Sequence, residues 1–248
     1  MAKIDLGKIS TRAPKGWDKE KTKAKTQALL TDLSDLQNRL YAAASHSVLV
    51  VIQGMDASGK DGLIRSVFGS MNPQGVTVKS FKAPSAEELA HDFLWRVHPH
   101  VPAKGMIQVF NRSHYEDILV TRVHKWCPDE KAKARIKAIN DFEQLLVEHN
   151  HTHVLKFYLH LSPEEQQLRL KERISQPEKQ WKYNANDFAE AKLWKDYRKY
   201  YHEALNKCQA VPWTVVPTDQ NWYKEWVVAN ALHQLLKSLD LQYPGLKK

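Results

Sequence analysis

A glycine-rich loop between a strand and a helix, in residues 47–63 (SVLVVIQGMDASGKDGL), constrains this chain more than any other feature. Residues 48–52 form an unbroken apolar run, which is typical of a strand buried on both faces. A G-x-x-x-x-G-K pattern follows, and an apolar helix pattern comes after it, which is the context that a phosphate-binding loop requires. The glycines let backbone N–H groups turn inward, and the lysine adds a full positive charge. We therefore predict a phosphate-chain site built from Gly54, Ala57, Ser58, Gly59, Lys60 and Asp61.

Two acidic side chains stand in this loop, where they would repel a bound phosphate chain. Asp61 occupies the position at which such loops commonly carry Ser or Thr, and Asp56 lies inside the loop. A carboxylate beside bound phosphates is favourable mainly when a metal ion lies between them, and Mg²⁺ prefers oxygen ligands of this kind. The loop therefore favours a magnesium-dependent phosphoryl transferase.

Charge and cysteine content narrow the partners and the compartment. The formal net charge of +9 favours a polyanionic partner, which leaves nucleic acid, an anionic membrane and a phosphate polymer open. The two cysteines lie far apart, which favours a reducing compartment without disulfides. The first ten residues lack an apolar signal core and no apolar run approaches the length of a membrane span, so we expect a cytoplasmic protein.

Strand and helix patterns alternate along the rest of the chain. Residues 1–17 have no clear period and are predicted to form an arm that lies on the surface or on a neighbouring subunit. Capping boxes at Ser85 and Ser162 mark two helix starts. The alternation predicts an α/β fold, with helices on both faces of a parallel sheet and ligands at the carboxyl ends of its strands. The expected strands are 48–52, 76–81, 106–110, 154–161 and 213–216, and the expected helices include 18–44, 85–95 and 222–239.

A second chemical cluster, FNRSHYED in residues 110–117, follows the third expected strand. Its position places it beside the phosphate loop, because parallel strands end at the same edge of a sheet. Arg112 can grip a phosphate with its planar guanidinium, and Asp117 can hold magnesium directly or through water. The same octapeptide taken alone also fits a helix start with surface charges, and the phosphate loop nearby favours the functional interpretation.

The two motifs GMDASGKDG and FNRSHYEDILVTRVH together resemble the polyphosphate kinase 2 family, and the similarity extends over residues 16–243. The resemblance implies a P-loop kinase fold of the thymidylate-kinase type, with three layers, a five-stranded parallel sheet and a helical lid. It also implies Mg²⁺-dependent transfer of a phosphoryl group between inorganic polyphosphate and a nucleotide, with Mn²⁺ as a substitute ion. Asp61 is part of the family pattern. Glu116 followed by Asp117 resembles the class III members, which accept both AMP and ADP.

The resemblance and the residue chemistry together assign the parts of the chain. We expect an arm and helix in residues 1–45 and a catalytic domain in 46–248, with a lid at about 170–186. The lid carries several cations around Pro177, although a solvated helix end and loop would explain Lys179 and Lys182 equally well. The expected catalytic residues are Asp56, Lys60, Arg112, Asp117 and Arg173, and the metal ligands Asp56, Asp61 and Asp117. The expected polyphosphate groove adds Arg65, Lys79, Lys82, Arg122, Lys171 and Lys182, and the nucleotide site uses Arg112, His114, Tyr115 and Glu116.

Two other functions remain open at this point. The same fold supports an ATP-dependent nucleoside monophosphate kinase, against which Asp61 and the basic excess weigh. A non-catalytic polyanion-binding protein would also keep the loop, but all three acids of the expected metal site are present. We expect inorganic polyphosphate and adenine nucleotides as partners, with other nucleotides also open, no nucleic acid and no membrane. A homo-oligomer, either a dimer or a tetramer, is expected.

Overall fold

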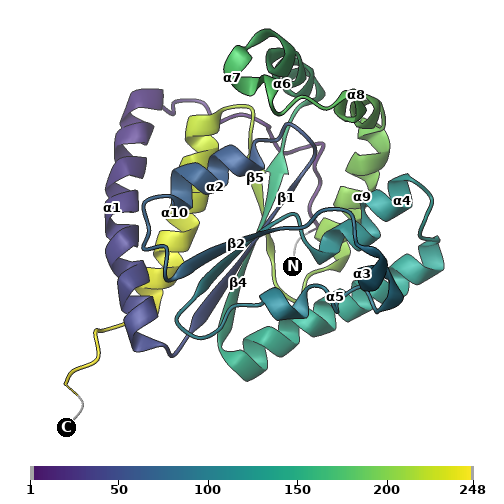
Figure 1. Cartoon of the computed structure of the whole chain (residues 1–248). Coiled ribbons are helices and arrows are strands. Elements are labelled where there is room, and N and C mark those ends of the chain that lie inside the picture. Colours follow the sequence, from purple (N-terminus) through teal and green to yellow (C-terminus); the bar gives the residue numbers. More distant parts are fainter. Residues whose placement is uncertain (1–2, 247–248) are drawn as a thin grey trace.

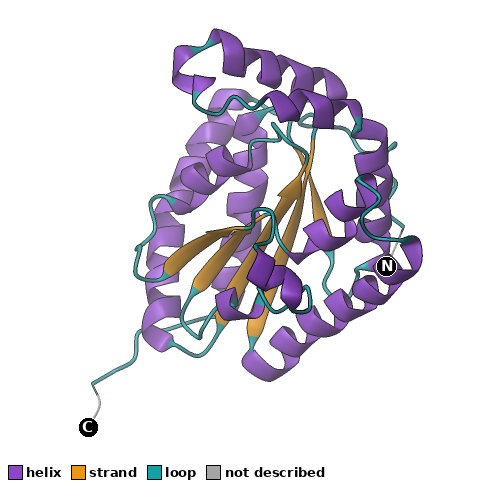
Figure 2. Cartoon of the chain, turned by 45° about the vertical axis from the view of Figure 1, so that its right-hand side comes forward, coloured by secondary structure: helices purple, strands orange, loops and turns teal. Residues whose placement is uncertain are grey.

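A five-stranded parallel sheet forms the centre of the molecule, as the computed structural model shows for residues 3–246 (Figures 1 and 2). Residues 1–2 of the predicted arm and residues 247–248 of the predicted catalytic domain lie outside the described range. The predicted α/β fold with five parallel strands is confirmed. In sheet order the strands are β2 (Val76–Ser80), β3 (Ile107–Asn111), β1 (Ser47–Gly54), β4 (Thr152–His160) and β5 (Trp213–Pro217).

The central strand β1 is buried on both faces, as its apolar run predicts. Val48, Val50 and Ile52 point into one hydrophobic cluster, and Leu49 and Val51 point into the other. This alternation follows from the two-residue period of a strand, and it explains why every position of β1 is apolar or fully enclosed. Because β1 pairs with both β3 and β4 in parallel, the carboxyl ends of these three strands meet at one edge.

Helices cover both faces of the sheet. On one face α1 (Lys19–Ala43), α2 (Lys60–Phe68) and α10 (Asn221–Ser238) pack through apolar stripes, seen on the left of Figure 1. On the other face lie the long helices α5 (Asp129–Asn150) and α9 (Trp194–Lys207), and both contribute to the second cluster. The short helices α3 (Ala86–Ala90) and α4 (Val120–Val123) lie on the same side as α5 and α9 in Figure 1, and two 3₁₀ helices span His98–His100 and His114–Ile118.

Three helices stand above the carboxyl edge of the sheet. They are α6 (Pro163–Ser175), α7 (Pro177–Gln180) and α8 (Ala185–Lys192), which form the upper part of the molecule in Figure 1. Pro177 starts α7 and ends the run of α6, because a residue before proline is disfavoured in the helical conformation. This segment therefore faces the phosphate loop from above.

The N-terminal arm lies on its own chain over its described residues. Ile4 N donates to Asn206 Oδ1 (2.8 Å), and Asn206 Nδ2 donates back to Ile4 O (2.9 Å). Further along, Thr11 Oγ1 donates to Asp219 Oδ2 (2.7 Å), and Leu6 is buried in the core. Of the two alternatives left open by the sequence, contact with the chain's own surface is the one that the structure has.

Two local predictions need correction. The helix predicted at 85–95 ends at Ala90, because the Asp92 side chain accepts from the N–H groups of Leu94 and Trp95 and fixes a separate turn there. The capping box at Ser85 is complete, whereas the one at Ser162 is only half formed. There the hydroxyl caps the helix as expected, but the Ser162 N–H donates to Asp219 Oδ1 (2.9 Å).

None of the helices in residues 3–246 combines the length and the apolar character that crossing a membrane requires.

Candidate active site

The phosphate loop connects the end of β1 to the start of α2, as predicted. Gly59 has a φ of +83°, a conformation that residues with a side chain rarely adopt. Gly54 has no room for a side chain, because an added Cβ would lie 2.9 Å from Leu159 Cβ and 2.8 Å from Ser58 Oγ. Both glycines of the motif are therefore needed for the shape of the loop, one for its backbone angle and one for close packing.

Lys60 lies across this loop. Its ammonium group donates to Gly54 O (2.7 Å) and Met55 O (3.1 Å), and the side chain is buried. Burial, followed by repulsion from Arg112, lowers the pKa of Lys60 to about 8. The lysine is thus held at the mouth of the loop by two backbone carbonyls, which a phosphate oxygen can replace.

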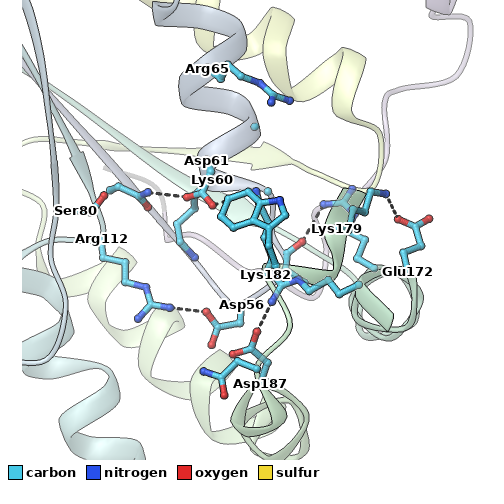
Figure 3. A pocket seen from close by; sticks show the side chains of 18 of the residues that line it. Asp56, Lys60, Asp61, Arg65, Ser80, Arg112, Glu172, Lys179, Lys182 and Asp187 are labelled. Atoms are coloured by element: carbon cyan, nitrogen blue, oxygen red, sulfur yellow. Dashed lines mark hydrogen bonds and ion pairs between the residues drawn. The ribbon is translucent and has the colours of Figure 1, made fainter. Parts of the chain in front are cut away.

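A cavity of about 810 Å³ opens in front of the loop, between α2 and the segment above the sheet (Figure 3). Eight Lys or Arg residues line it against five Asp or Glu residues, so its walls carry a positive excess. Such a cavity suits a polyanion, because positive charge predominates on its walls. The lining cations are Lys60, Arg65, Lys82, Arg112, Arg169, Arg173, Lys179 and Lys182, and the acids are Asp56, Asp61, Glu172, Glu178 and Asp187.

Arg112 and Asp56 form an ion pair at the inner end of this cavity, with Nη2 and Oδ1 2.5 Å apart (Figure 3). Arg112 follows β3 directly and has a φ of +62°, an uncommon value for a residue with a side chain. Burial alone would lower the pKa of Arg112, but Asp56 and Glu116 outweigh it and raise the pKa above its ordinary value. The guanidinium is therefore a permanent cation aimed at the phosphate loop.

Asp61 faces the cavity from the first turn of α2. Its carboxylate accepts from Asn111 Nδ2 (2.8 Å) and from Lys182 Nζ (3.4 Å), and the side chain is 64% exposed. Burial raises its pKa, but the Asn111 hydrogen bond and Lys182 outweigh this and lower the pKa below its ordinary value. Asp61 is therefore ionised, and it is joined to the segment above the sheet through Lys182.

The carboxylates also decide how a metal ion would be held. Asp56 and Asp61 both line the first cavity, whereas Asp117 pairs with Arg135 (3.3 Å) and lines a different one. Within residues 3–246, no three His, Cys, Asp or Glu side chains come together as a preformed metal site. Mg²⁺ in kinase-like sites is usually bound through one or two carboxylates together with substrate phosphates. The pair Asp56 and Asp61 fits that arrangement in the first cavity, whereas Asp117 lines the second cavity together with Asp56, so the predicted set of three metal ligands stays a prediction.

A second cavity, of about 930 Å³, adjoins the first. Its walls include apolar side chains, among them Leu89, Val97, Val120, Trp126 and Tyr197, and polar groups from the segment that follows β3. The two cavities share Asp56, Phe81, Lys82, Arg112, Asn184 and Asp187. A molecule in either cavity therefore reaches the same arginine.

The segment above the sheet supplies a second arginine. Arg173, near the end of α6, lines the first cavity and is ion-paired with Asp187 of α8. Burial and then Asp56 raise the pKa of Asp187 above its ordinary value. Lys179 is held in the same way by Glu172, with 2.6 Å between nitrogen and oxygen. These cations are thus neutralised by neighbours within their own segment.

Residues 16–244 match the family described as Polyphosphate kinase 2 (PPK2). The chain belongs to this family. The chain is 47% identical over 214 residues to the AMP/ADP-polyphosphate phosphotransferase of Meiothermus ruber. This alignment covers 86% of this chain and 80% of the relative. It is 41% identical to the ADP-polyphosphate phosphotransferase of Rhodopseudomonas palustris, over 98% of this chain and 89% of the relative.

A solved PPK2 structure has the same fold. The crystal structure of polyphosphate kinase 2 from Arthrobacter aurescens TC1 superimposes with a TM-score of 0.95 at 39% identity, covering 99% of this chain and 89% of the other.

Most of the residues predicted from the PPK2 resemblance come together at the two cavities. The first cavity is lined by Asp56, Ala57, Gly59, Lys60, Asp61, Arg65, Lys82, Arg112, Arg173 and Lys182, and the second also by His114, Glu116 and Asp117. Burial raises the pKa of Glu116, although Arg112 and Lys60 oppose that shift, and burial likewise raises the pKa of Asp117 against Arg135.

Two predicted residues line neither cavity and are engaged with other side chains. Arg122 does not line either cavity: its guanidinium pairs with Asp129 (2.7 Å) and Glu203 (2.8 Å) and lies over the Tyr200 ring. Tyr115 is fully buried, and its hydroxyl donates to Glu143 Oε1 (2.7 Å). Both side chains are buried and already paired, Tyr115 with the buried Glu143 and Arg122 with Glu203 and the exposed Asp129.

Four other predicted residues lie beside the cavities without lining them. Gly54 and Ser58 shape the loop from behind, Lys79 is half-buried on β2, and Lys171 is exposed on α6. Sequence reasoning also missed lining residues, because their signals were ordinary. Asn111 was visible as the last residue of a strand and Arg169 stands one turn before Arg173, whereas others, among them Asn184, Asp187 and Asn221, had no distinguishing pattern.

Proposed function

We propose that this chain transfers a phosphoryl group from inorganic polyphosphate to AMP and to ADP, giving ADP and ATP. The observation that carries the proposal is the pair of cavities that meet at Arg112, one cationic and one with apolar walls. The names of the relatives from Meiothermus ruber and Rhodopseudomonas palustris support it, since both are named as polyphosphate phosphotransferases. Acceptance of both nucleotides is the narrower part of the proposal, and it follows the first of these relatives.

Polyphosphate occupies the first cavity in this proposal. The phosphate loop presents N–H groups and the positive end of α2 to an anion, and Lys60 stands beside them. Seven further cations continue around the cavity, which suits a flexible polyanion that is bound by charge and not by shape. A strong decrease in affinity with rising salt is the expected consequence.

The nucleotide occupies the second cavity. Its apolar side chains offer contact area to a nucleoside, and Arg112 at the boundary reaches the nucleotide's phosphate. Glu116 and Asp117 lie on this side, so they act on the acceptor in our assignment and not on the donor. The acceptor phosphate then points toward the phosphate loop, which allows in-line attack at the terminal phosphorus of polyphosphate.

Transfer itself needs position and charge rather than a covalent residue. Lys60 and the loop hold the donor, and Arg112 bridges donor and acceptor while Asp56 fixes its orientation. Asp56 and Asp61 would hold Mg²⁺, or Mn²⁺ in its place, and that ion offsets charge developing on the moving phosphoryl group. Residues 170–186 act as a lid, in which Arg173 exchanges Asp187 for the reacting phosphates.

One assay tests the whole proposal. Full-length protein is incubated with MgCl₂, long-chain polyphosphate and either AMP or ADP, and the nucleotides are separated by chromatography. We expect ADP and ATP to form, and less than a tenth of the rate in Lys60→Ala. Faster phosphorylation of AMP by ATP than by polyphosphate would identify an ATP-dependent nucleotide kinase. Binding of polyphosphate without any product would identify a polyanion-binding protein.

We also propose that the protein is a homo-oligomer, a dimer or a tetramer. Leu145 and Val147 on α5 support this, because they are 44% and 42% exposed on one helix. Light scattering on purified protein measures the assembly directly, and the mass of a single chain would contradict the proposal.

A further inference from the structure

The back of the phosphate loop is held by two cationic side chains from different helices. Arg169 Nη1 of α6 donates to Ala57 O (3.2 Å) and Ser58 O (3.3 Å). Lys224 Nζ of α10 donates to Gly59 O (3.2 Å) and also approaches Ser58 O (3.5 Å). Three consecutive carbonyls of the loop therefore accept hydrogen bonds from side chains of α6 and α10.

Lys224 has no local reason to be a lysine. It is 1% exposed in the N-terminal part of an 18-residue helix, where the helix dipole disfavours a cation. Across residues 3–246 no carboxylate oxygen lies within ion-pair distance of its ammonium, whose other partner is the neutral Asn221 Oδ1 (2.9 Å). A buried cation without a counter-charge is costly, and that cost is removed when an anion binds close by.

The loop is shaped to accept this lysine. A Cβ added to Gly59 would lie 2.5 Å from Lys224 Nζ, so the glycine makes space for the ammonium as well as for its own backbone angle. Lys224 does not line either cavity, whereas its neighbours Asn221 and Arg169 line the first. It therefore touches the loop and not the substrate.

We propose that Lys224, assisted by Arg169, is a positioning residue for the polyphosphate donor. The Ala57 carbonyl shares its peptide group with the Ser58 N–H, which donates within the loop to Met55 O (3.1 Å). By accepting hydrogen bonds at the Ser58 and Gly59 oxygens, the next two peptide groups are held so that the N–H groups of Gly59 and Lys60 serve the donor. Hydrogen bonds in such a chain polarise one another, so each N–H becomes a stronger donor to phosphate. The proposal rests on the assignment of the first cavity to polyphosphate.

The protonation of Lys224 supplies an observable consequence. Burial, and then the nearby charges of Arg169 and Lys60, set its pKa at about 7, while Glu225 acts in the opposite direction. Near neutral pH part of the empty protein then carries a neutral amine at this position. A bound phosphate chain favours the ammonium form, so binding takes up a proton at Lys224.

The test uses Lys224→Met and Lys224→Gln in the full chain, with tripolyphosphate and MgCl₂ as the probe. Lys237→Met is the matched control, since Lys237 is an exposed lysine on the same helix. Calorimetry at pH 7.5 in two buffers of different ionisation enthalpy gives both the Kd and the number of protons taken up. Initial rates with varied polyphosphate and varied AMP give the two KM values.

We expect Lys224→Met to raise the Kd for tripolyphosphate at least tenfold and to take up measurably fewer protons on binding than the wild type does. The KM for AMP should stay within twofold, and Lys237→Met should match the wild type in every measurement. Lys224→Gln keeps a donor without a charge, so it should show the same loss of proton uptake with a smaller rise in Kd. It also serves if Lys224→Met does not fold.

An unchanged proton uptake in folded Lys224→Met or Lys224→Gln overturns the proposal, as does an equal rise in the KM for AMP and for polyphosphate. Failure of the proposed function gives a different result. In that case the wild type itself neither binds tripolyphosphate nor uses polyphosphate.

Discussion

Lys156→Met should destabilise the protein strongly, because it removes one half of a buried ion pair. Lys156 Nζ lies 2.6 Å from Glu143 Oε2, and both side chains are fully buried. The same ammonium donates to Tyr115 Oη (2.8 Å) and Cys208 O (3.0 Å) and lies 4.8 Å from the centre of the Trp213 ring. Methionine keeps most of the aliphatic stem, so the loss is mainly that of charge and donors.

The magnitude follows from what is left behind. Glu143 would keep the Tyr115 hydroxyl but lose its cation, and breaking a buried pair in this way typically costs about 3–5 kcal/mol. For a chain of this length that corresponds to a Tm lower by roughly 6–20 °C. Differential scanning calorimetry and urea unfolding measure the two quantities independently.

The pH dependence provides a sharper check. In the wild type, burial raises the pKa of Glu143, but Lys156 and His114 overcome it, so the net pKa lies below the ordinary value. That depressed pKa contributes stability above pH ~4.5 and loses it as the pH falls through the folded value. In Lys156→Met the buried carboxyl loses Lys156, the largest influence that lowers its pKa, so the pKa of Glu143 rises and protonation of Glu143 at lower pH stabilises the variant. The difference in free energy of unfolding between the wild type and Lys156→Met should therefore decrease from pH 8 to pH 5.

Lys156→Met/Glu143→Gln is the matched control, because it removes both charges. It should be more stable than Lys156→Met at pH 8. A loss below about 1 kcal/mol in Lys156→Met, or a gap that does not change with pH, would refute the reasoning.

Three further predictions concern catalysis. Lys60→Ala should leave the fold intact and reduce turnover more than tenfold, and retained turnover would contradict its role. In the wild type, kcat/KM for polyphosphate should fall as the pH rises through about 8, because burial lowers the pKa of Lys60 to that value and the ammonium form is the one that binds phosphate. Asp61→Asn should raise the Mg²⁺ concentration needed for half-maximal rate, whereas Asp117→Asn should leave that concentration unchanged and alter the KM for AMP. An equal rise in the required Mg²⁺ concentration in both variants would identify Asp117 as a metal ligand as well. Arg173→Met should lower kcat by roughly 10²–10³ with little change in stability or in the KM for polyphosphate; a steep rise in KM at constant kcat would make it only a binding residue.

The fold and the phosphate loop could be predicted from sequence because their signals are local. The run 48–52 is apolar at every position since β1 is enclosed by both clusters, and the motif after it sets its own backbone shape. The carboxyl-edge rule then brought Arg112 beside the loop, although it lies 52 positions after Lys60.

Partners that meet across the chain could not be predicted in the same way. Arg122 is an unremarkable cation in sequence, and its partner Glu203 is 81 positions away. Tyr115 lies in a motif with functional residues on both sides, yet a one-residue step along a short helix turns its side chain toward Glu143. Asp117 is likewise directed away from Asp61 and toward Arg135. Composition and spacing carry no information on the direction in which such side chains point.

The attachment of the N-terminal arm has a consequence for synthesis on the ribosome. Ile4 and Thr11 find their partners at Asn206 and Asp219, which are made about 200 residues later. At ~5–20 residues per second, the arm waits roughly 10–40 s before its binding surface exists. Over that interval the early strands and helices can already associate, while residues 4–11 stay without their native contacts. The beginning of this chain is therefore among the last parts to reach its final place.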